Sequence, residues 1–241
     1  MKLEVYLAPA ELGERNLVGT VAAVIDVLRA TSTIVEAVAN GARTIFPATD
    51  MDDAMRLAQT IGRSEVLLCG ERGARKIEGF DLGNSPLEFT SDAVADKLVV
   101  MTTTNGTPAL VSGQAADRCI VASFLNLSAA ARDLVTSGKP IVIMCAGREG
   151  RFSLDDALCA GSLIRALRDG YDGRVRMNDA ALAASALEKR YRAHLGAVMR
   201  RTAAARQIVE AGHADDIDYC LTRDRHDVVP VMSNRQITRA V

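Results

Sequence analysis

The sequence predicts a three-layer α/β/α fold around a mostly parallel or mixed central sheet. Short apolar runs alternate with amphipathic stretches along the 241 residues, as they do when crossover helices cover the strands of a sheet. Several runs are apolar throughout, which indicates strands that are buried on both faces. The amphipathic stretches end at glycines, which commonly terminate helices. We therefore expect a single α/β domain over residues 1–241.

The elements follow from these patterns in order along the chain. Apolar runs predict strands over residues 3–7, 20–27, 43–46, 65–69, 97–102, 118–122, 140–145 and 227–232. Helices are expected over residues 33–40, 50–61, 126–137 and 153–169, the first of them opened by the capping pair Thr33 and Glu36. The Ala-rich segment from Asn178 to Ala211 breaks the alternation and predicts two helices joined near Gly196, in a smaller helical lobe at about residues 178–212.

Composition limits the partners of the protein. With 29 Lys and Arg against 30 Asp and Glu, the net charge of -1 argues against attachment to nucleic acid by bulk charge. Only 4% of the residues are aromatic, so platforms that stack bases are not expected either. The composition, 49% hydrophobic and 24% charged, is that of a chain that buries a real core. We expect a small molecule, not nucleic acid, as the partner.

The cysteines and the N-terminus predict a compartment. The five cysteines are odd in number, widely spaced and mostly set in apolar runs, which favours small buried hydrophobes in a reducing cytoplasm over a disulfide framework. The first residues reach Pro9 before a signal-like apolar stretch could form. No apolar run approaches the ~18 residues that a membrane span needs. The expectation is a soluble, cytoplasmic protein without membrane contact.

The first candidate site segment follows the predicted strand 20–27. Asp26 leaves this strand, Arg29 comes three residues later, and the hydroxyl residues Thr31 to Thr33 open a helix. Free N–H groups at the helix start, together with Arg29, suit a phosphate or sulfonate, and Asp26 suits a hard cation. The alternative is purely structural, with hydroxyls that cap the helix and an Asp26–Arg29 ion pair.

Two further segments follow the strands 65–69 and 97–102. Arg72, in a glycine-rich stretch, is a candidate oxyanion ligand, and Ser85-Pro86 predicts the start of a short helix. Residues 101–108 combine hydroxyls with Gly106 ahead of a helix and supply neutral donors for anion oxygens. A glycine-rich surface loop and a capped turn are the structural alternatives.

The fourth segment, residues 145–156, combines both signs of charge. Arg148 and Arg151 bracket Glu149, and Asp155 and Asp156 lie in the first turn of the next helix. The helix dipole favours acidic residues there without any function. If Glu149 and one aspartate converge with Asp26, however, they form the all-oxygen site that Mg²⁺ prefers.

The basic stretch over residues 189–206 and the histidines carry no clear site. An anionic polymer is one conceivable partner for the stretch, but it is interpreted as a solvated helical face or as one that pairs with acids of a second subunit, which leaves a homodimer open. His194, His213 and His226 lack metal-ligand spacing.

Together and in this order, the segments resemble the 2-phosphosulfolactate phosphatase family. The resemblance runs from about residue 2 to residue 235 and is carried by residues 24–41, 70–73 with 79–86, 102–106, 145–161, and Asp218 to Cys220 with Asp224. It implies a phosphatase-like domain and a Mg²⁺-dependent phosphoric monoester hydrolase. Such an enzyme converts 2-phosphosulfolactate, or a similar phosphorylated hydroxy acid, to sulfolactate and phosphate, a step in coenzyme M biosynthesis.

This reading assigns roles to specific residues. Asp26, Arg29 and Arg72 are expected to be catalytic, and Asp26, Glu149 and Asp156 to hold Mg²⁺. The residues expected to bind substrate are Ser32, Asn84, Ser85, Thr104, Asn105, Gly106 and Arg148. The nucleophile is left open between a metal-bound water and a phospho-aspartyl intermediate at Asp26, although Leu28 stands where an Asp-x-Asp pair would have its second carboxylate.

Two other function classes are weighed against the phosphatase. A non-catalytic binding protein for small anionic metabolites would keep the arginines and helix starts but would need no converging carboxylates. A dinucleotide-dependent oxidoreductase would need a Gly-x-Gly-x-x-Gly turn after the first buried strand. Residues 26–32 contain no glycine, which argues against the oxidoreductase.

Overall fold

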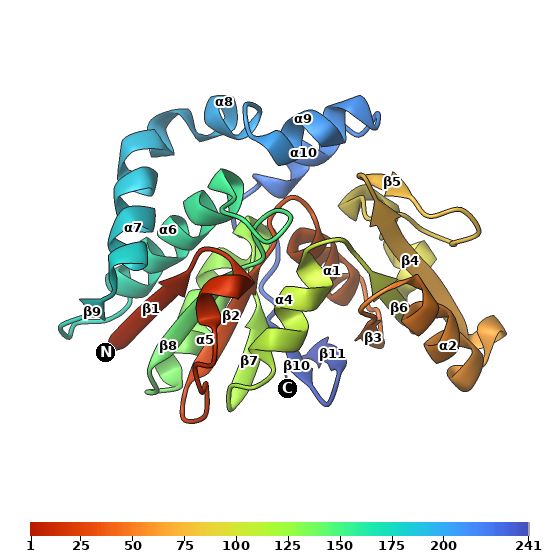
Figure 1. Cartoon of the computed structure of the whole chain (residues 1–241), viewed down its shortest axis with the longest axis horizontal. Coiled ribbons are helices and arrows are strands. Elements are labelled where there is room, and N and C mark those ends of the chain that lie inside the picture. The colour runs from red at the N-terminus through yellow and green to blue at the C-terminus, as the bar shows by residue number, and fades with distance from the viewer. Residues whose placement is uncertain (241) are drawn as a thin grey trace.

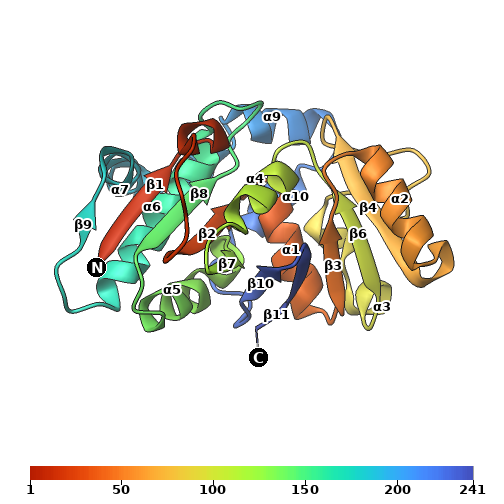
Figure 2. The same ribbon diagram turned by 60° about the horizontal axis from the view of Figure 1, so that its bottom comes forward.

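An 11-stranded mixed sheet forms the centre of the computed structural model, which describes residues 1–240 (Figures 1 and 2). Along the sheet the order is β5-β4-β6-β3-β11-β10-β7-β2-β8-β1-β9. Helices cover both faces, so the α/β/α expectation is confirmed.

Two groups of parallel strands make up most of the sheet. One, called the β2 group, comprises β7 (Arg118–Val121), β2 (Val21–Ile25), β8 (Ile141–Cys145), β1 (Lys2–Tyr6) and β9 (Arg176–Met177). The other, called the β6 group, comprises β4 (Val66–Arg72), β6 (Leu98–Thr102) and β3 (Thr44–Pro47), with β5 (Arg75–Lys76) antiparallel at its edge.

A hairpin near the C-terminus joins the two groups. Its strands, β10 (Pro230–Ser233) and β11 (Gln236–Arg239), pair antiparallel with each other. β10 pairs with β7 through two residue pairs, and β11 pairs with β3 through the single pair Ile237–Ile45. Figure 2 shows the hairpin between the two groups. The sequence predicted β10, but β11, β5 and β9 are short and carry no apolar run that would have revealed them.

Strand β2 is buried on both faces, as its unbroken apolar run predicts. Ala23 and Ile25 pack into the cluster formed with α5 (Leu127–Thr136), α6 (Leu154–Asp169) and α7 (Asp179–Tyr191). Ala22 and Val24 pack on the other face with α1 (Ala30–Ala39) and α4 (Gly106–Gly113). Helix α2 (Met51–Ile61) covers the β6 group. The alternation of side chains along the strand therefore sorts the helices into two layers.

Helix α1 corrects one expectation. It begins at Ala30, three residues before the predicted start, because the Thr31 N–H reaches the Asp26 carbonyl at 2.9 Å and the helix grows directly from the strand exit. Thr33 and Glu36 therefore lie buried inside the helix and do not cap it. The Thr33 hydroxyl instead donates to the Asn84 carbonyl at 2.9 Å. The predicted capping pair is wrong, and the hydroxyl ties α1 to the loop that carries Asn84.

The segment from residue 178 onward contains more breaks than predicted. After α7 the chain forms a 3-10 turn and then α8 (Leu195–Met199), α9 (Ala203–Glu210) and α10 (Asp215–Cys220). Instead of two helices joined near Gly196, residues 178–211 therefore carry three. Figure 1 shows α9 at the top, between the β2 group and the β6 group. One further short helix, α3 (Ser91–Val94), precedes β6.

All five cysteines are free and buried within the described residues, as expected from their apolar surroundings. Burial raises the pKa of Cys119 and that of Cys220 to about 12, so these thiols stay protonated at neutral pH. Over residues 1–240, none of the helices combines the length and the apolar character needed to cross a bilayer.

Candidate active site

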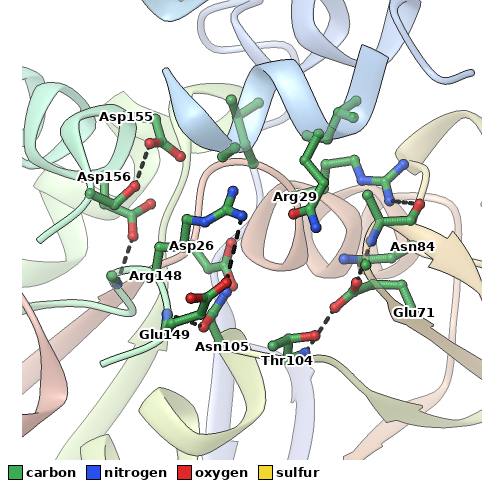
Figure 3. A pocket seen from close by; sticks show the side chains of 18 residues that line it. Asp26, Arg29, Glu71, Asn84, Thr104, Asn105, Arg148, Glu149, Asp155 and Asp156 are labelled. Carbon is green, nitrogen blue, oxygen red and sulfur yellow. Dashed lines mark hydrogen bonds and ion pairs between the residues drawn. The ribbon is translucent and has the colours of Figure 1, made fainter. Parts of the chain in front are cut away.

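A cavity of about 210 Å³ lies where strands of both groups end (Figure 3). Its lining comes from the segments that follow β2, β4, β6 and β8, from the start of α6, and from α9. The polar lining residues are Asp26, Arg29, Glu71, Asn84, Thr104, Asn105, Arg148, Glu149, Ser153, Asp155, Asp156 and Gln207. The β2 group and the β6 group therefore contribute to one site, as expected for ligands that collect at strand ends.

Three buried aspartates form one side of this cavity, here called the carboxylate wall: Asp26, Asp155 and Asp156. Burial, followed by repulsion from Asp155 and Glu71, raises the pKa of Asp26 to about 7. Burial also raises the pKa of Asp155. The pKa of Asp156 lies well above its ordinary value because of burial and then the charges of Asp155 and Asp26. The wall is a cluster of like charges in which burial and mutual repulsion outweigh the attraction of Arg29 and Arg148.

Asp156 holds two strand exits together. One carboxylate oxygen accepts the Val27 N–H at 2.9 Å, and the other accepts the Gly147 N–H at 3.0 Å. Gly147 has φ 65°, and a Cβ there would lie 2.3 Å from the Arg151 carbonyl oxygen, so only glycine fits this turn. Asp156 thus fixes the loops after β2 and β8 relative to each other.

Asp26 lies against the N-terminus of α4. A Cβ added to Gly106 would come within 2.7 Å of the Asp26 Oδ2 and 2.5 Å of the Ala30 Cβ. The glycine therefore allows the helix start to approach the carboxylate closely. The positive end of the helix dipole favours the ionised form of Asp26, but burial outweighs it, since the net pKa shift is upward.

Arg148 is the cation that remains available at the carboxylate wall. Its guanidinium lies 3.6 Å from the Glu149 Oε1, and the Glu149 side chain is 72% exposed. The Glu149 N–H donates to the Asn105 Oδ1 at 2.9 Å, which links the loops after β8 and β6. Figure 3 shows Arg148 on the same side of the cavity as Asp155 and Asp156. A long, exposed ion pair of this kind is weak, so the guanidinium is free to bind an anion.

The opposite side of the cavity is lined by Arg29 and Glu71, and Asp216 and Ser85 lie behind them; these four residues are here called the anchored wall. The Arg29 guanidinium lies 2.6 Å from the Asp216 Oδ2 and donates to the Ala74 carbonyl at 2.8 Å. The other oxygen of Asp216 accepts the Ser85 hydroxyl at 2.5 Å. Both members of the ion pair are at least 97% buried. Helix α10 is thereby fastened to the loops that carry Arg29 and Ser85.

Glu71 completes the anchored wall. Its Oε1 accepts the Thr104 N–H and its Oε2 accepts the Ala74 N–H, each at 2.8 Å. Figure 3 shows Glu71 reaching Thr104 across the edge of the cavity. Each charged carboxylate of this wall is therefore matched by a cation or by N–H groups, in contrast to Asp26 and Asp155 of the carboxylate wall, whose raised pKa values show that the charges around them are not balanced.

The structure brings many of the sequence-predicted site residues to the cavity. These are Asp26, Arg29, Asn84, Thr104, Asn105, Arg148, Glu149 and Asp156. Ser85 and Gly106 lie directly behind the lining, through their contacts with Asp216 and Asp26.

Two predicted residues lie outside the lining. Ser32 is buried and donates to the Val27 carbonyl at 2.9 Å, so it stabilises the start of α1. Arg72 is exposed and donates to the Glu71 carbonyl at 2.7 Å and to the Thr102 hydroxyl at 3.3 Å. In this structure Arg72 strengthens the contact between β4 and β6 and does not face the cavity.

Five polar residues at the site were not among the predicted site residues: Glu71, Ser153, Asp155, Gln207 and Asp216. Asp155 is one of two candidate carboxylates in the first turn of α6, and nothing in the sequence distinguishes it from Asp156. Asp216 lies in an acidic run with Asp215 and Asp218, and nothing in that run marks the one carboxylate that is buried.

The predicted set of Mg²⁺ ligands is not assembled. Over residues 1–240, no three His, Cys, Asp or Glu side chains form a group that could hold a metal ion. Asp156 is occupied by two N–H groups, and Glu149 faces solvent beside Arg148. Mg²⁺ is commonly held by one or two carboxylates with water and substrate phosphate, a mode that needs no cage of protein ligands. The buried, uncompensated Asp26 and Asp155 fit that mode.

Comparisons with known proteins point to one family over nearly the whole chain. The model of a family described as 2-phosphosulpholactate phosphatase matches residues 6–235. A relative named "Probable 2-phosphosulfolactate phosphatase" from Caldanaerobacter subterraneus subsp. tengcongensis is 41% identical over 234 residues, covering 97% of this chain and 96% of the relative. Proteins of the same name from Clostridium beijerinckii and Symbiobacterium thermophilum are 35% identical over 238 residues and 39% identical over 233 residues. Those alignments cover 99% of each chain in the first case, and 97% of this chain and 98% of the relative in the second.

Proposed function

Because the chain belongs to the 2-phosphosulfolactate phosphatase family, we propose that it hydrolyses the phosphate monoester of 2-phosphosulfolactate to sulfolactate and inorganic phosphate. A similar phosphorylated hydroxy acid with a sulfonate or carboxylate is the broader substrate class. The observation that carries the proposal is the meeting of a buried carboxylate wall with Arg148 in one cavity at the strand ends.

The reaction demands several cooperating groups. Enzymes accelerate phosphate monoester hydrolysis by up to ~10²¹-fold, or roughly 28 kcal/mol at ~1.36 kcal/mol per decade. No single side chain supplies that much. Arg148 is proposed to bind the phosphoryl oxygens in two-point fashion, and the Thr104–Asn105 turn at the start of α4 is proposed to donate to the charge that develops in the transition state.

Mg²⁺ is proposed as the cation that the carboxylate wall needs. Asp26 and Asp155 would hold it together with water and the phosphate of the substrate, and the ion would neutralise charge on the phosphoryl oxygens. Support comes from the burial of both carboxylates and from their raised pKa values, since Arg29 and Arg148 nearby do not balance the negative charge. Asp156 takes a positioning role, because its two oxygens hold the loops on either side of the site.

Asp26 is proposed to take the proton of the attacking water. One of its carboxylate oxygens would contact Mg²⁺, and the other would accept the proton. The water oxygen forms a bond to phosphorus as the bond from phosphorus to the ester oxygen breaks. The proton passes to the departing alkoxide, so that the hydroxy acid and hydrogen phosphate are the products.

The proposal extends to the setting of the reaction. Five buried, unpaired thiols are typical of a reducing compartment and support a cytoplasmic location. The resemblance described above also implies a place in coenzyme M biosynthesis. The partners proposed are a small anionic substrate and a second copy of the chain in a homodimer.

Phosphate release from 2-phosphosulfolactate tests the function. Purified protein with Mg²⁺ should release phosphate, and chelation should stop the release. The Asp92→Asn variant, which changes an exposed carboxylate on α3, should behave as the wild type and serves as the control. A protein that releases no phosphate from this or any related ester overturns the function, whereas release that is unaffected by chelation overturns only the metal.

A further inference from the structure

Helix α9 forms one side of the cavity. Three of its residues, Ala204, Gln207 and Ile208, line the cavity, and their spacing of three and four places them on one face of the helix. Ala203 and Arg206 are exposed to solvent. Figure 3 shows the blue ribbon of this part of the chain above the labelled side chains. The face of α9 with Ala204, Gln207 and Ile208 is here called the roof of the cavity.

The roof is fastened at both ends and in the middle. The Thr202 side chain caps the first turn of α9, and the Arg75 guanidinium donates to the carbonyl of Glu210, its last residue, at 3.0 Å. Between these two points the buried Ile208 packs in one cluster with Ala74, which lies in the turn between β4 and β5. Because the helix is held in this way, a larger side chain on its inner face takes space from the cavity.

The lining at the roof differs in its chemistry from the two walls. Leu28, Ala74 and Ile208 line the cavity and belong to one apolar cluster, and Ala204 lies one turn before Ile208 on the roof. Hydrocarbon makes no directional bond to a phosphate, carboxylate or sulfonate. An apolar surface of this kind therefore selects a ligand by the size of its carbon skeleton and not by its charges.

The volume of the cavity makes such a selection effective. At about 210 Å³ it is smaller than the ~300–1,000 Å³ of pockets that bind drug-sized ligands. Ile208 is buried in the apolar cluster, whereas Ala204 is half-buried and has only a methyl group. A larger apolar residue at position 204 would narrow the cavity without changing its charge.

We infer that the roof limits the length of the carbon chain that the substrate carries beside its phosphate, with Ala204 as a specificity-determining residue. The inference rests on the proposed function for the chemical class of the substrate, a phosphorylated hydroxy acid. It adds a selection that Arg148 and the carboxylate wall cannot make, since longer hydroxy acids carry the same phosphate and carboxylate. In an apolar pocket, one methylene changes kcat/KM by ~10–200-fold.

Phosphate esters that differ only in chain length test this limit. The phosphate esters of lactate, 2-hydroxybutyrate and 2-hydroxyhexanoate are compared by kcat/KM in the presence of Mg²⁺. For the wild type, kcat/KM should fall at least ~10-fold along this series. Ala204→Leu should move the fall to shorter chains, and Ala204→Gly should move it to longer ones.

The matched control is Ala203→Leu, which adds the same side chain on the exposed side of the same helix. It should keep the chain-length profile of the wild type. Thermal melts check that each variant is folded, and Ala204→Val takes the place of the leucine variant if that one is unfolded. A profile that Ala204→Val and Ala204→Gly both leave unchanged overturns the inference. So does a loss in a folded Ala204→Leu that is equal for all three esters.

Phosphonate analogues of the same acids separate this inference from the proposed function, because they bind without being hydrolysed. Calorimetry should show affinity falling with chain length in the wild type and falling earlier in Ala204→Leu. Equal affinity of the wild type for every length overturns the inference and leaves the proposed function standing. If the phosphonates bind with this limit but no ester is hydrolysed, the proposed function fails and the inference stands. Binding of none of the phosphonates overturns the inference as well.

Discussion

Both walls of the cavity contain buried carboxylates, but only in the anchored wall are all of their charges balanced by neighbouring groups. In the anchored wall, Arg29 meets Asp216, and Glu71 meets two N–H groups, so burial is compensated. In the carboxylate wall, Asp26 and Asp155 are buried with like charges around them, and their pKa values are raised. The difference teaches that a buried charge near a site is informative only when its partners are known. The paired charges of Arg29 and Asp216 stabilise the fold, whereas the unbalanced charges of Asp26 and Asp155 suit a bound cation.

The largest expected effect comes from removing charge in the carboxylate wall. Asp26→Asn should lower the rate of phosphate release by roughly 10³-fold, since it removes both the proposed base and a metal ligand. The melting temperature should stay unchanged or rise, because a buried repulsive charge is lost. Steady-state kinetics and thermal melts measure both. A large fall in stability would mean that the carboxylate is structural after all.

Substitutions in the anchored wall should lower the stability of the protein. Asp216→Ala leaves the Arg29 charge buried without a partner, which costs ~3–5 kcal/mol and should lower the melting temperature by roughly 6–20 °C. The matched control is Asp218→Ala on the same helix, whose ion pair with Arg200 is more than half exposed. It should cost less than ~1 kcal/mol. Similar melting temperatures for the two variants would contradict the role assigned to the buried pair.

Arg148 and Arg72, the other two arginines predicted at the site, should differ in their effect on substrate binding. Arg148→Ala should raise KM by roughly 10–100-fold at little cost in stability, because hydrogen bonds to charged groups contribute ~1.5–3 kcal/mol each. Arg72→Ala should change KM less than about 3-fold, since Arg72 is exposed and bonds to Glu71 and Thr102. A reversed order of the two KM values would return Arg72 to the substrate site.

The smallest expected effect is a change of the melting temperature with pH. A carboxyl whose folded pKa is raised from 3.8 to about 7 binds more protons folded than unfolded, so the free energy of unfolding falls as pH rises between those values. In chelator, the melting temperature should therefore fall by a few degrees from about pH 4.5 to 7.5. Added Mg²⁺ should reduce the fall, and Asp26→Asn should flatten it. A slope that neither change alters would assign it to other groups.

The sequence predicted the helix and sheet layers better than it predicted the contacts between individual strands and side chains. Unbroken apolar runs such as that of β2 mark buried strands, and polar residues at their ends mark the site, because both signals are local. Strand β11 escaped prediction, since it meets β3 through one residue pair.

The partners of the charges are non-local and could not be read from the sequence. Arg29 and Asp216 are 187 positions apart, and no spacing rule connects them. Asp155 and Asp156 are adjacent, and about 100° of helix rotation decides which one faces the cavity with a free oxygen. The family resemblance located the right segments but did not tell which of their charged residues are compensated.

The hairpin of β10 and β11 has a consequence for synthesis. Both strand groups are complete by residue 177, and Asp216 follows only 39 residues later, yet the strands that join the groups are residues 230–239. During translation the sheet becomes continuous only after the hairpin has been made. It closes through contacts between distant parts of the chain, and such contacts form slowly. Until the hairpin is made, β7 and β3 keep open edges, although the two groups already share a hydrophobic core.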